Sequence, residues 1–208
     1  MAIAPIQISV AVEGLIDEAV LRRLVEQTGA QLGPVHGRNG KAQLLQRLNG
    51  YNSAARFQPW IVLVDLDQDA DCAPPFRAMH LPTSAPDMCF RVAVREVEAW
   101  LMADRDALAS FLSLPAARIP HQPDVEVDPK RKLVEIARLS RRRAIREGMV
   151  PRPESGRAVG PAYTSIMIEF SQTKWRPAVA EQTSDSLRRC RVRLQELIER
   201  YPLTKGSR

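Results

Sequence analysis

The stretch PWIVLVDLD, residues 59–67, decides how the rest of the chain is interpreted. Its short, continuous apolar run is typical of a strand that is buried on both faces of a parallel sheet. The run ends in Asp65 and Asp67. In an extended chain residues i and i+2 point to the same face, so these two carboxylates are expected on one side of the strand end, with Cα atoms roughly 6–7 Å apart. An aspartate inside an apolar run needs a partner, and a cation would supply one.

Strands and helices are predicted to alternate on both sides of this stretch, whereas residues 68–87, rich in Asp, Pro and Ser, are predicted to be a loop. The expected strands are 6–12, 32–37 and 88–94, and the expected helices are 16–27, a segment starting near Lys41, and 95–108. Alternation of this kind predicts an α/β fold with a mainly parallel, Rossmann-like sheet flanked by helices.

The sequence changes character after residue 112. Residues 115–130 contain four prolines and predict a linker or an ordered loop. Helices are expected at 131–148, around 163–170 and at 186–201, and the first and last of these are amphipathic with arginine-rich outer faces. We therefore predict an α/β core at 1–112 and a basic, mainly helical region at 113–208 that packs on it.

Charge is distributed unevenly along the 208 residues. Residues 1–128 hold 11 Lys/Arg and 16 Asp/Glu, whereas residues 129–208 hold 19 and 8. This asymmetry predicts a cation site beside a surface that binds a polyanion, with nucleic acid, and DNA in particular, as the expected partner. Solvated, arginine-rich helix faces are the plainer interpretation. The residues expected to contact phosphates are Arg141, Arg142, Arg143, Arg188, Arg189 and Lys174.

The chain is expected to be a cytoplasmic protein. No apolar run reaches the roughly 20 residues of a membrane span, and the first residues lack the basic start of a signal peptide. The three cysteines form no CxxC pair and leave one unpaired, which argues against a disulfide framework or a zinc knuckle.

Another acidic residue, Glu13, follows the first expected strand, before Gly14 and Asp17. Ligands bind open α/β sheets beyond the carboxyl ends of the strands. If the first strand neighbours the strand at 59–67, Glu13, Asp65 and Asp67 converge on one rim, and Gly14 lets the chain turn away. A cluster of carboxylates is costly without a cation, and Mg²⁺, or Mn²⁺ in its place, suits such ligands. The spacings required for a calcium loop, a phosphate loop and a zinc site are not met.

A strand ending in Glu-Gly, an acid four residues later, and an apolar strand ending in Asp-x-Asp resemble the TOPRIM domain of topoisomerases, bacterial primases and OLD-type nucleases. The E-x-x-x-D spacing of Glu13 and Asp17 is closest to the OLD type. The stretch VAVREVEAWLMAD further resembles small bacterial TOPRIM-like proteins filed as a domain of unknown function, often found beside an ATPase partner. The resemblance covers residues 6–105.

This resemblance implies a divalent-metal site for phosphodiester hydrolysis, in a defence or DNA-processing system. Glu13 would act as acid/base or contact the metal, Asp65 and Asp67 would be the principal Mg²⁺ ligands, and Asp17 would be an outer ligand of a second ion. Glu98, or Glu96, would complete that second site. Two features of OLD nucleases have no clear counterpart. The chain has no ATPase domain of its own, and the lysine near the scissile phosphate is represented only by the weak candidates Lys132 and Lys174.

Two other functions stay open at this point. The first is a TOPRIM-derived module that binds nucleic acid or protein without cleavage. The second is a phosphatase of the haloacid dehalogenase type, whose first motif also ends in DxD. Against the phosphatase, the fifth motif position is Asp69 instead of Thr or Val. The sequence also leaves open DNA versus RNA, strandedness and the oligomeric state, a dimer included.

Overall fold

The computed structural model describes residues 5–201, which form two compact units. The first unit comprises residues 5–64, 72–92 and 189–201, and the second comprises 65–71 and 93–188. Each unit therefore gathers segments that are far apart in the sequence. In the described part of the chain, no helix combines the length and the apolar character that crossing a membrane requires.

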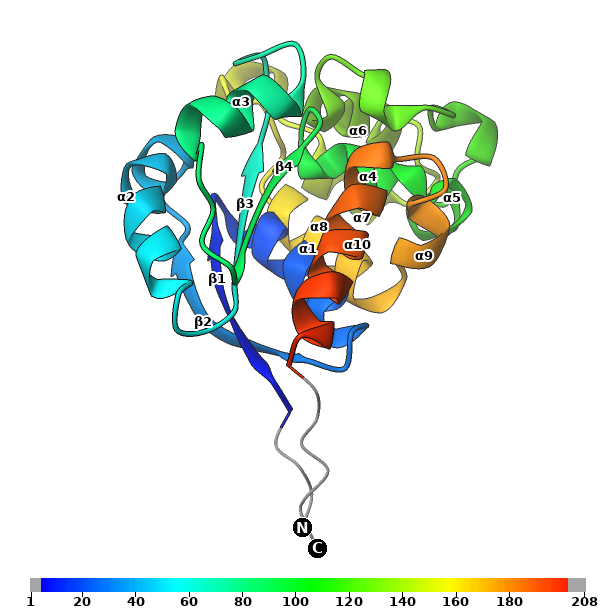
Figure 1. The fold of residues 1–208 in the computed structure, drawn as a ribbon. Helices are drawn as coiled ribbons and strands as arrows, with labels where there is room; N and C mark the ends of the chain where they lie inside the picture. The colour runs from blue at the N-terminus through cyan, green and yellow to red at the C-terminus, as the bar shows by residue number, and fades with distance from the viewer. Residues whose placement is uncertain (1–4, 202–208) are drawn as a thin grey trace, which may run out of the picture. The chain divides into compact units, whose positions relative to one another are not determined.

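A four-stranded parallel sheet forms the centre of the first unit, in the order β2-β1-β3-β4 (Figure 1). The strands are β1 (Gln7–Val12), β2 (Gln31–Gly37), β3 (Trp60–Asp65) and β4 (Met88–Ala93). All six residues of β3 are buried, as expected for its apolar run. The predicted α/β class with a parallel, Rossmann-like sheet is confirmed, and so is the pairing of β1 with β3.

The edge strand β2 owes its shape to its glycines. The register with β1 shifts between Ile8 and Val10, so β2 contains a bulge where Gly33 and Pro34 stand. Gly37 ends the strand at φ +85°, and a Cβ atom on it would lie 2.2 Å from the carbonyl oxygen of Val12. Only glycine tolerates that combination, so β2 ends there and the chain turns towards the next helix.

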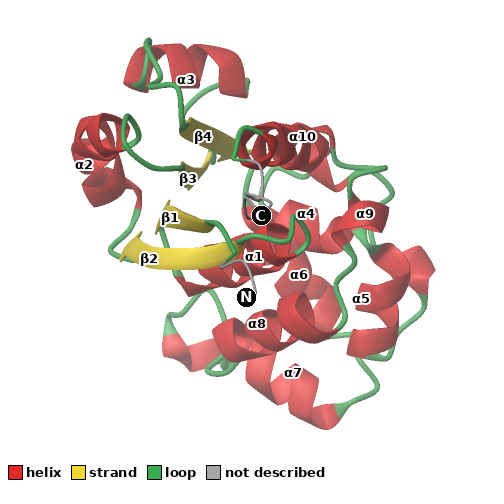
Figure 2. Ribbon diagram, turned by 60° about the horizontal axis from the view of Figure 1, so that its bottom comes forward, coloured by secondary structure: helices red, strands yellow, loops and turns green. Residues whose placement is uncertain are grey.

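Helices cover both faces of the sheet within the first unit (Figure 2). They are α1 (Leu15–Glu26), α2 (Lys41–Ala54), α3 (Ala73–His80) and the later part of α10 (Asp185–Glu199). Figure 2 shows α2 and α3 on one face, and α1 and α10 on the other. The end of α10 is attached to the start of β4, because the Tyr201 hydroxyl donates to Asp87 Oδ2 at 2.5 Å.

The prediction of a loop throughout residues 68–87 was wrong, because α3 lies within it. Two prolines, Pro74 and Pro75, stand in the first turn of α3. Proline is tolerated there because the N–H groups of the first turn have no partner inside the helix. The Phe76 side chain is buried, so one face of this short helix packs against the rest of the protein.

The second unit is helical around two buried tryptophans. Its helices are α4 (Val97–Ala103), α5 (Arg105–Leu112), α6 (Pro129–Ala137), α7 (Arg143–Met149), α8 (Tyr163–Thr173), α9 (Pro177–Ala180) and the first turn of α10, with 3₁₀ turns at Ala116–Arg118, Pro123–Val125 and Pro153–Ser155. Trp100 is fully buried, and its Nε1 donates to Ser186 Oγ at 2.7 Å. Trp175, also fully buried, donates from Nε1 to the carbonyl oxygen of Trp100 at 3.1 Å.

Two helices predicted as continuous are each divided. The helix expected at 95–108 breaks at Asp104, whose carboxylate accepts hydrogen bonds from Ala107 N–H and from Arg176. The helix expected at 131–148 breaks near Ser140, whose hydroxyl donates to the carbonyl oxygen of Leu112 at 2.5 Å. In both cases the partner that favours the break lies in another segment of the chain.

Candidate functional site

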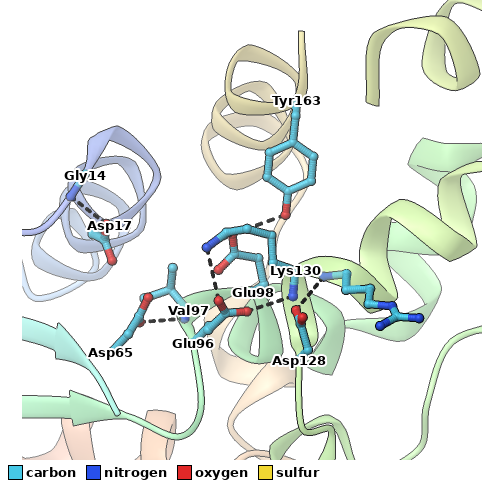
Figure 3. Close-up of polar contacts among 10 residues, drawn as sticks. Gly14, Asp17, Asp65, Glu96, Val97, Glu98, Asp128, Lys130 and Tyr163 are labelled. Atoms are coloured by element: carbon cyan, nitrogen blue, oxygen red, sulfur yellow. Dashed lines mark hydrogen bonds and ion pairs between the residues drawn. The ribbon is translucent and has the colours of Figure 1, made fainter. Parts of the chain in front are cut away.

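Asp65 is the last residue of β3, and its side chain contacts the start of α4. Its Oδ1 accepts a hydrogen bond from the backbone N–H of Val97 at 2.9 Å (Figure 3), and its side chain is buried. The Val97 N–H is one of the groups in a first helical turn that lack a partner within the helix. Asp65 therefore caps α4 from a distance of 32 residues in the sequence.

Asp67 lies beyond the strand. β3 ends at Asp65, and the backbone of Asp67 has φ +49°, in the left-handed region that aspartate tolerates better than most residues. The expectation that Asp65 and Asp67 share one face of an extended strand was therefore wrong. Arg95 holds this turn, because its Nη1 donates to the carbonyl oxygens of Asp67, at 2.8 Å, and Ala70, at 2.9 Å.

Glu96 and Glu98 both contact Lys130, which lies in the first turn of α6. Lys130 Nζ lies 3.1 Å from Glu96 Oε1 and 3.6 Å from Glu98 Oε1 (Figure 3). Glu96 also accepts a hydrogen bond from the backbone N–H of Lys130 at 2.8 Å, through Oε2. One glutamate thus contacts both the backbone and the side chain of Lys130, and so attaches the start of α6 to the start of α4.

Glu98 is the most deeply buried acid of this group, with 1% of its surface exposed. Its Oε1 accepts a hydrogen bond from the Tyr163 hydroxyl at 3.2 Å, while its buried Oε2 has no hydrogen-bond partner among residues 5–201 (Figure 3). Burial raises the pKa of Glu98, although the charge of Lys130 opposes that shift. Burial and the neighbouring Glu98 also raise the pKa of Tyr163 well above its ordinary value, which keeps the phenol protonated.

Lys130 remains cationic despite its surroundings. Burial lowers the pKa of Lys130, but Glu98 and then Glu96 raise it by more, so the net pKa lies above the ordinary lysine value. Asp65 contributes to the same electrostatic effect. The described group therefore consists of Lys130 and three neighbouring carboxylates, and the Lys130 side chain is 39% exposed.

A cavity of about 530 Å³ opens beside this group in the second unit. The residues that line it include Asp67, Glu96, Asp128 and Lys130. Its other lining residues are Gln68, Val127, Arg131, Val134, Glu135, Arg138, Pro151 and Ala158. A ligand in this cavity would meet the Asp67 turn and Lys130 together.

Glu13 and Asp17 belong to the first unit and are described within it. Glu13 follows β1 directly, and Asp17 stands in the first turn of α1 with its side chain buried. Asp17 Oδ2 accepts a hydrogen bond from the backbone N–H of Gly14 at 2.9 Å (Figure 3), so this carboxylate caps its own helix. Their convergence with Asp65 and Asp67 stays a prediction. Among residues 5–201 no group of three or more His, Cys, Asp or Glu side chains is arranged to hold a metal ion.

Sequence reasoning missed Lys130 and Tyr163. Two other lysines were the candidates for the position near the scissile phosphate. Lys132 lies 3.8 Å from Glu126, and Lys174 is exposed after the end of α8. The sequence signal near Lys130 is the segment Asp-Pro-Lys at 128–130, which is typical of a helix start. In the structure Pro129 opens α6, and Asp128 accepts a hydrogen bond from Arg131 N–H at 2.8 Å. These features mark a helix start, but a lysine in a first turn acquires a role only through the segment it meets.

The arginines predicted to contact phosphates do not all follow one helix. Arg141 and Arg142 precede α7, and Arg142 Nη1 donates to the carbonyl oxygen of Phe111 at 3.2 Å. Arg143 Nε lies 2.7 Å from Glu147 Oε1, and Arg188 pairs with Asp185. The helix expected at 131–148 therefore does not continue through Arg141 and Arg142. The roles of these residues, and of Arg189 and Lys174, in nucleic-acid binding stay predictions.

Neither the models of protein families, nor the curated proteins, nor the solved structures contain a match to this chain.

Proposed function

We propose that the protein is a Mg²⁺-dependent nuclease of the TOPRIM type, which hydrolyses phosphodiester bonds of nucleic acid and serves as the effector of an ATPase-linked defence or DNA-processing system. The observation that supports it most is the position of Lys130. Its ammonium lies between Glu96 and Glu98 and lines the same cavity as Asp67. Carboxylates beside a cation that solvent can reach are the groups that phosphoryl chemistry uses.

The chemistry of the carboxylates suits a hard cation. Glu98 Oε2 is buried without a hydrogen-bond partner among residues 5–201, which is costly for an oxygen that carries charge. Mg²⁺ prefers carboxylate and water oxygens. Asp65 and Asp67 would hold one ion, and Glu98 or Glu96 would contribute to a second. Glu13 and Asp17 are the further ligands that the resemblance to TOPRIM nucleases implies. When bound, Mg²⁺ lowers the pKa of a water molecule and neutralises charge on a phosphate.

The chain's own residues have separate tasks in this proposal. Lys130, protonated because its pKa is raised, would donate to a non-bridging phosphate oxygen of the substrate. Tyr163 orients the Glu98 carboxylate, and Asp65 fixes the first turn of α4 from which Glu98 projects. Arg95 holds the turn that presents Asp67. The phosphate would thus meet groups whose positions are set before it binds.

One observation favours the alternative of a binding module without catalysis. Lys130 already neutralises Glu96 and Glu98, and the described residues include no preformed group of metal ligands. A module of this kind would use the cavity to bind a phosphate and would not cleave it. The two functions differ in whether the carboxylates bind a divalent ion.

Calorimetric titration of Mn²⁺ tests the proposal. The wild type should release or absorb heat on binding, and Asp65→Asn/Asp67→Asn should not. Asp69→Asn/Asp71→Asn is the matched control, because it removes the same charge from two exposed acids of the neighbouring loop and should bind as the wild type does. Mn²⁺-dependent cleavage of DNA or RNA should follow the same pattern. Equal binding by all three proteins, or binding without any cleavage, would overturn the nuclease.

A further inference from the structure

A second cavity adjoins the one beside Lys130. It measures about 450 Å³ and shares Arg138 and Pro151 with the first cavity. Its remaining lining residues are Arg146, Glu147, Val150 and Arg152. Because two residues line both, the cavities form one continuous depression in the second unit. We name it the arginine groove and define it by Arg131, Arg138, Arg146 and Arg152.

The groove offers free guanidinium groups. Arg138, which follows α6, and Arg152, which precedes the 3₁₀ turn at Pro153–Ser155, are both exposed. Between residues 5 and 201 neither guanidinium has a hydrogen bond or an ion pair. Arg146, by contrast, donates to the carbonyl oxygen of Ser140. Exposed arginines without partners pay little desolvation cost when they bind a phosphate, and each can contact it through two N–H groups.

The lining also indicates which form of nucleic acid fits. Proteins that bind single strands stack the bases on aromatic side chains. No aromatic residue lines either cavity in the described part of the chain. What the groove offers is positive charge for a backbone, which suits a duplex whose bases stay paired. Most of the acids that line the groove belong to the cavity beside Lys130, whereas the second cavity is lined by three arginines and one acid, Glu147.

We propose that the arginine groove binds the sugar-phosphate backbone of a duplex nucleic acid and leads it to the carboxylates around Lys130. This inference rests on the proposed nuclease function and specifies its substrate. Arg138 and Arg152 contact phosphates in a sequence-independent way. Binding is therefore sensitive to salt and insensitive to base sequence.

Fluorescence anisotropy in EDTA, where no cleavage occurs, tests the groove. The probe is a labelled duplex of about 20 base pairs, long enough to fill one site. Arg138→Gln/Arg152→Gln should weaken binding about 50-fold at about 0.1 M salt, because each lost phosphate contact lowers the salt slope by about 0.9. Arg118→Gln is the matched control. It removes an exposed arginine of the same unit that lines neither cavity, and it should bind as the wild type does.

The outcomes separate the groove from the nuclease. Weaker duplex binding by the double variant and a salt slope lower by about 2 would support the groove, even if Mn²⁺-dependent cleavage were never observed. Equal binding by wild type and double variant would overturn the groove, and the nuclease would stand if Mn²⁺-dependent cleavage persisted. Tighter binding of the unpaired strand than of the duplex would overturn the inference that the substrate is a duplex.

Discussion

The helices α1 and α4 both follow a parallel strand and both carry acids in their first turn, yet the acids serve different purposes. In α1, Asp17 accepts a hydrogen bond from the N–H of Gly14 three residues earlier. In α4, the N–H of Val97 is satisfied by Asp65, from another strand. An acid that caps its own helix is occupied by local structure. A remote cap leaves the acids of the helix available for other contacts.

That difference explains the positions of Glu96 and Glu98. With the α4 cap supplied by Asp65, both glutamates turn to Lys130, and Glu98 also meets Tyr163. In the second unit the two glutamates therefore pair with Lys130, whereas in the first unit the Asp17 carboxylate caps α1. Three substitutions test this comparison, from the largest expected effect on stability to the smallest.

The first substitution is Asp65→Ala. It should lower the free energy of unfolding by about 2–3 kcal/mol, because it removes a buried, charged hydrogen-bond acceptor and leaves the N–H of Val97 without a partner. Urea unfolding followed by circular dichroism measures the loss. Asp65→Asn is the control, since its amide oxygen still accepts the hydrogen bond and should restore more than half of the loss. Equal losses for the two variants would show that charge, and not capping, is what Asp65 supplies.

The second substitution, Lys130→Met, tests the ion pairs. At pH 8 it should destabilise the protein by about 1–2 kcal/mol, less than for a fully buried pair because the Lys130 side chain is 39% exposed. Burial already raises the pKa of Glu98, and loss of Lys130 raises it further. A carboxyl whose pKa is higher in the folded protein costs stability where it is ionised, and the cost disappears as it becomes protonated. The destabilisation should therefore fade as pH falls towards 4.5, the ordinary glutamate value.

The matched control for this pH profile is Lys132→Met. Lys132 stands on the same helix and lies 3.8 Å from Glu126, which is partly exposed. Its replacement should cost less at pH 8 and should change little with pH. If Lys130→Met gave a loss that did not vary between pH 8 and pH 4.5, the ion pair with the buried Glu98 would not be the cause.

The sheet could be predicted because its signals are local. The apolar runs at 59–67 and 88–94 became β3 and β4 almost within their predicted limits, and Gly37 marked the end of β2. The division of the helices could not be predicted, because Asp104 and Ser140 break them through Arg176 and Leu112, whose positions only the tertiary fold provides.

The candidate site could be predicted only in part, because some of its contacts exist only in the tertiary fold. Asp65 was recognised as an acid at a strand end and Glu98 through the resemblance, and the structure brings both near Lys130. Lys130 itself stands in a run of basic residues, PKRK, where a solvated helix face is the ordinary interpretation. What distinguishes it is contact with two glutamates 34 and 32 positions earlier, and no sequence spacing encodes that contact.

The third and smallest effect is expected for Asp17→Ala, at about 0.5–1 kcal/mol, because a lost helix cap costs little where water can replace it. Gly14 is half-buried, so its N–H gains access to water when the carboxylate is removed. Urea unfolding measures the loss, and Asp17→Asn, which keeps an acceptor oxygen, should recover most of it. A loss as large as that of Asp65→Ala would break the comparison, since it would mean that the local cap stabilises the fold as much as the remote one. Retained stability with weaker Mn²⁺ binding in Asp17→Asn would also count against the comparison, because the acid of α1 would then serve both its helix and a metal ion.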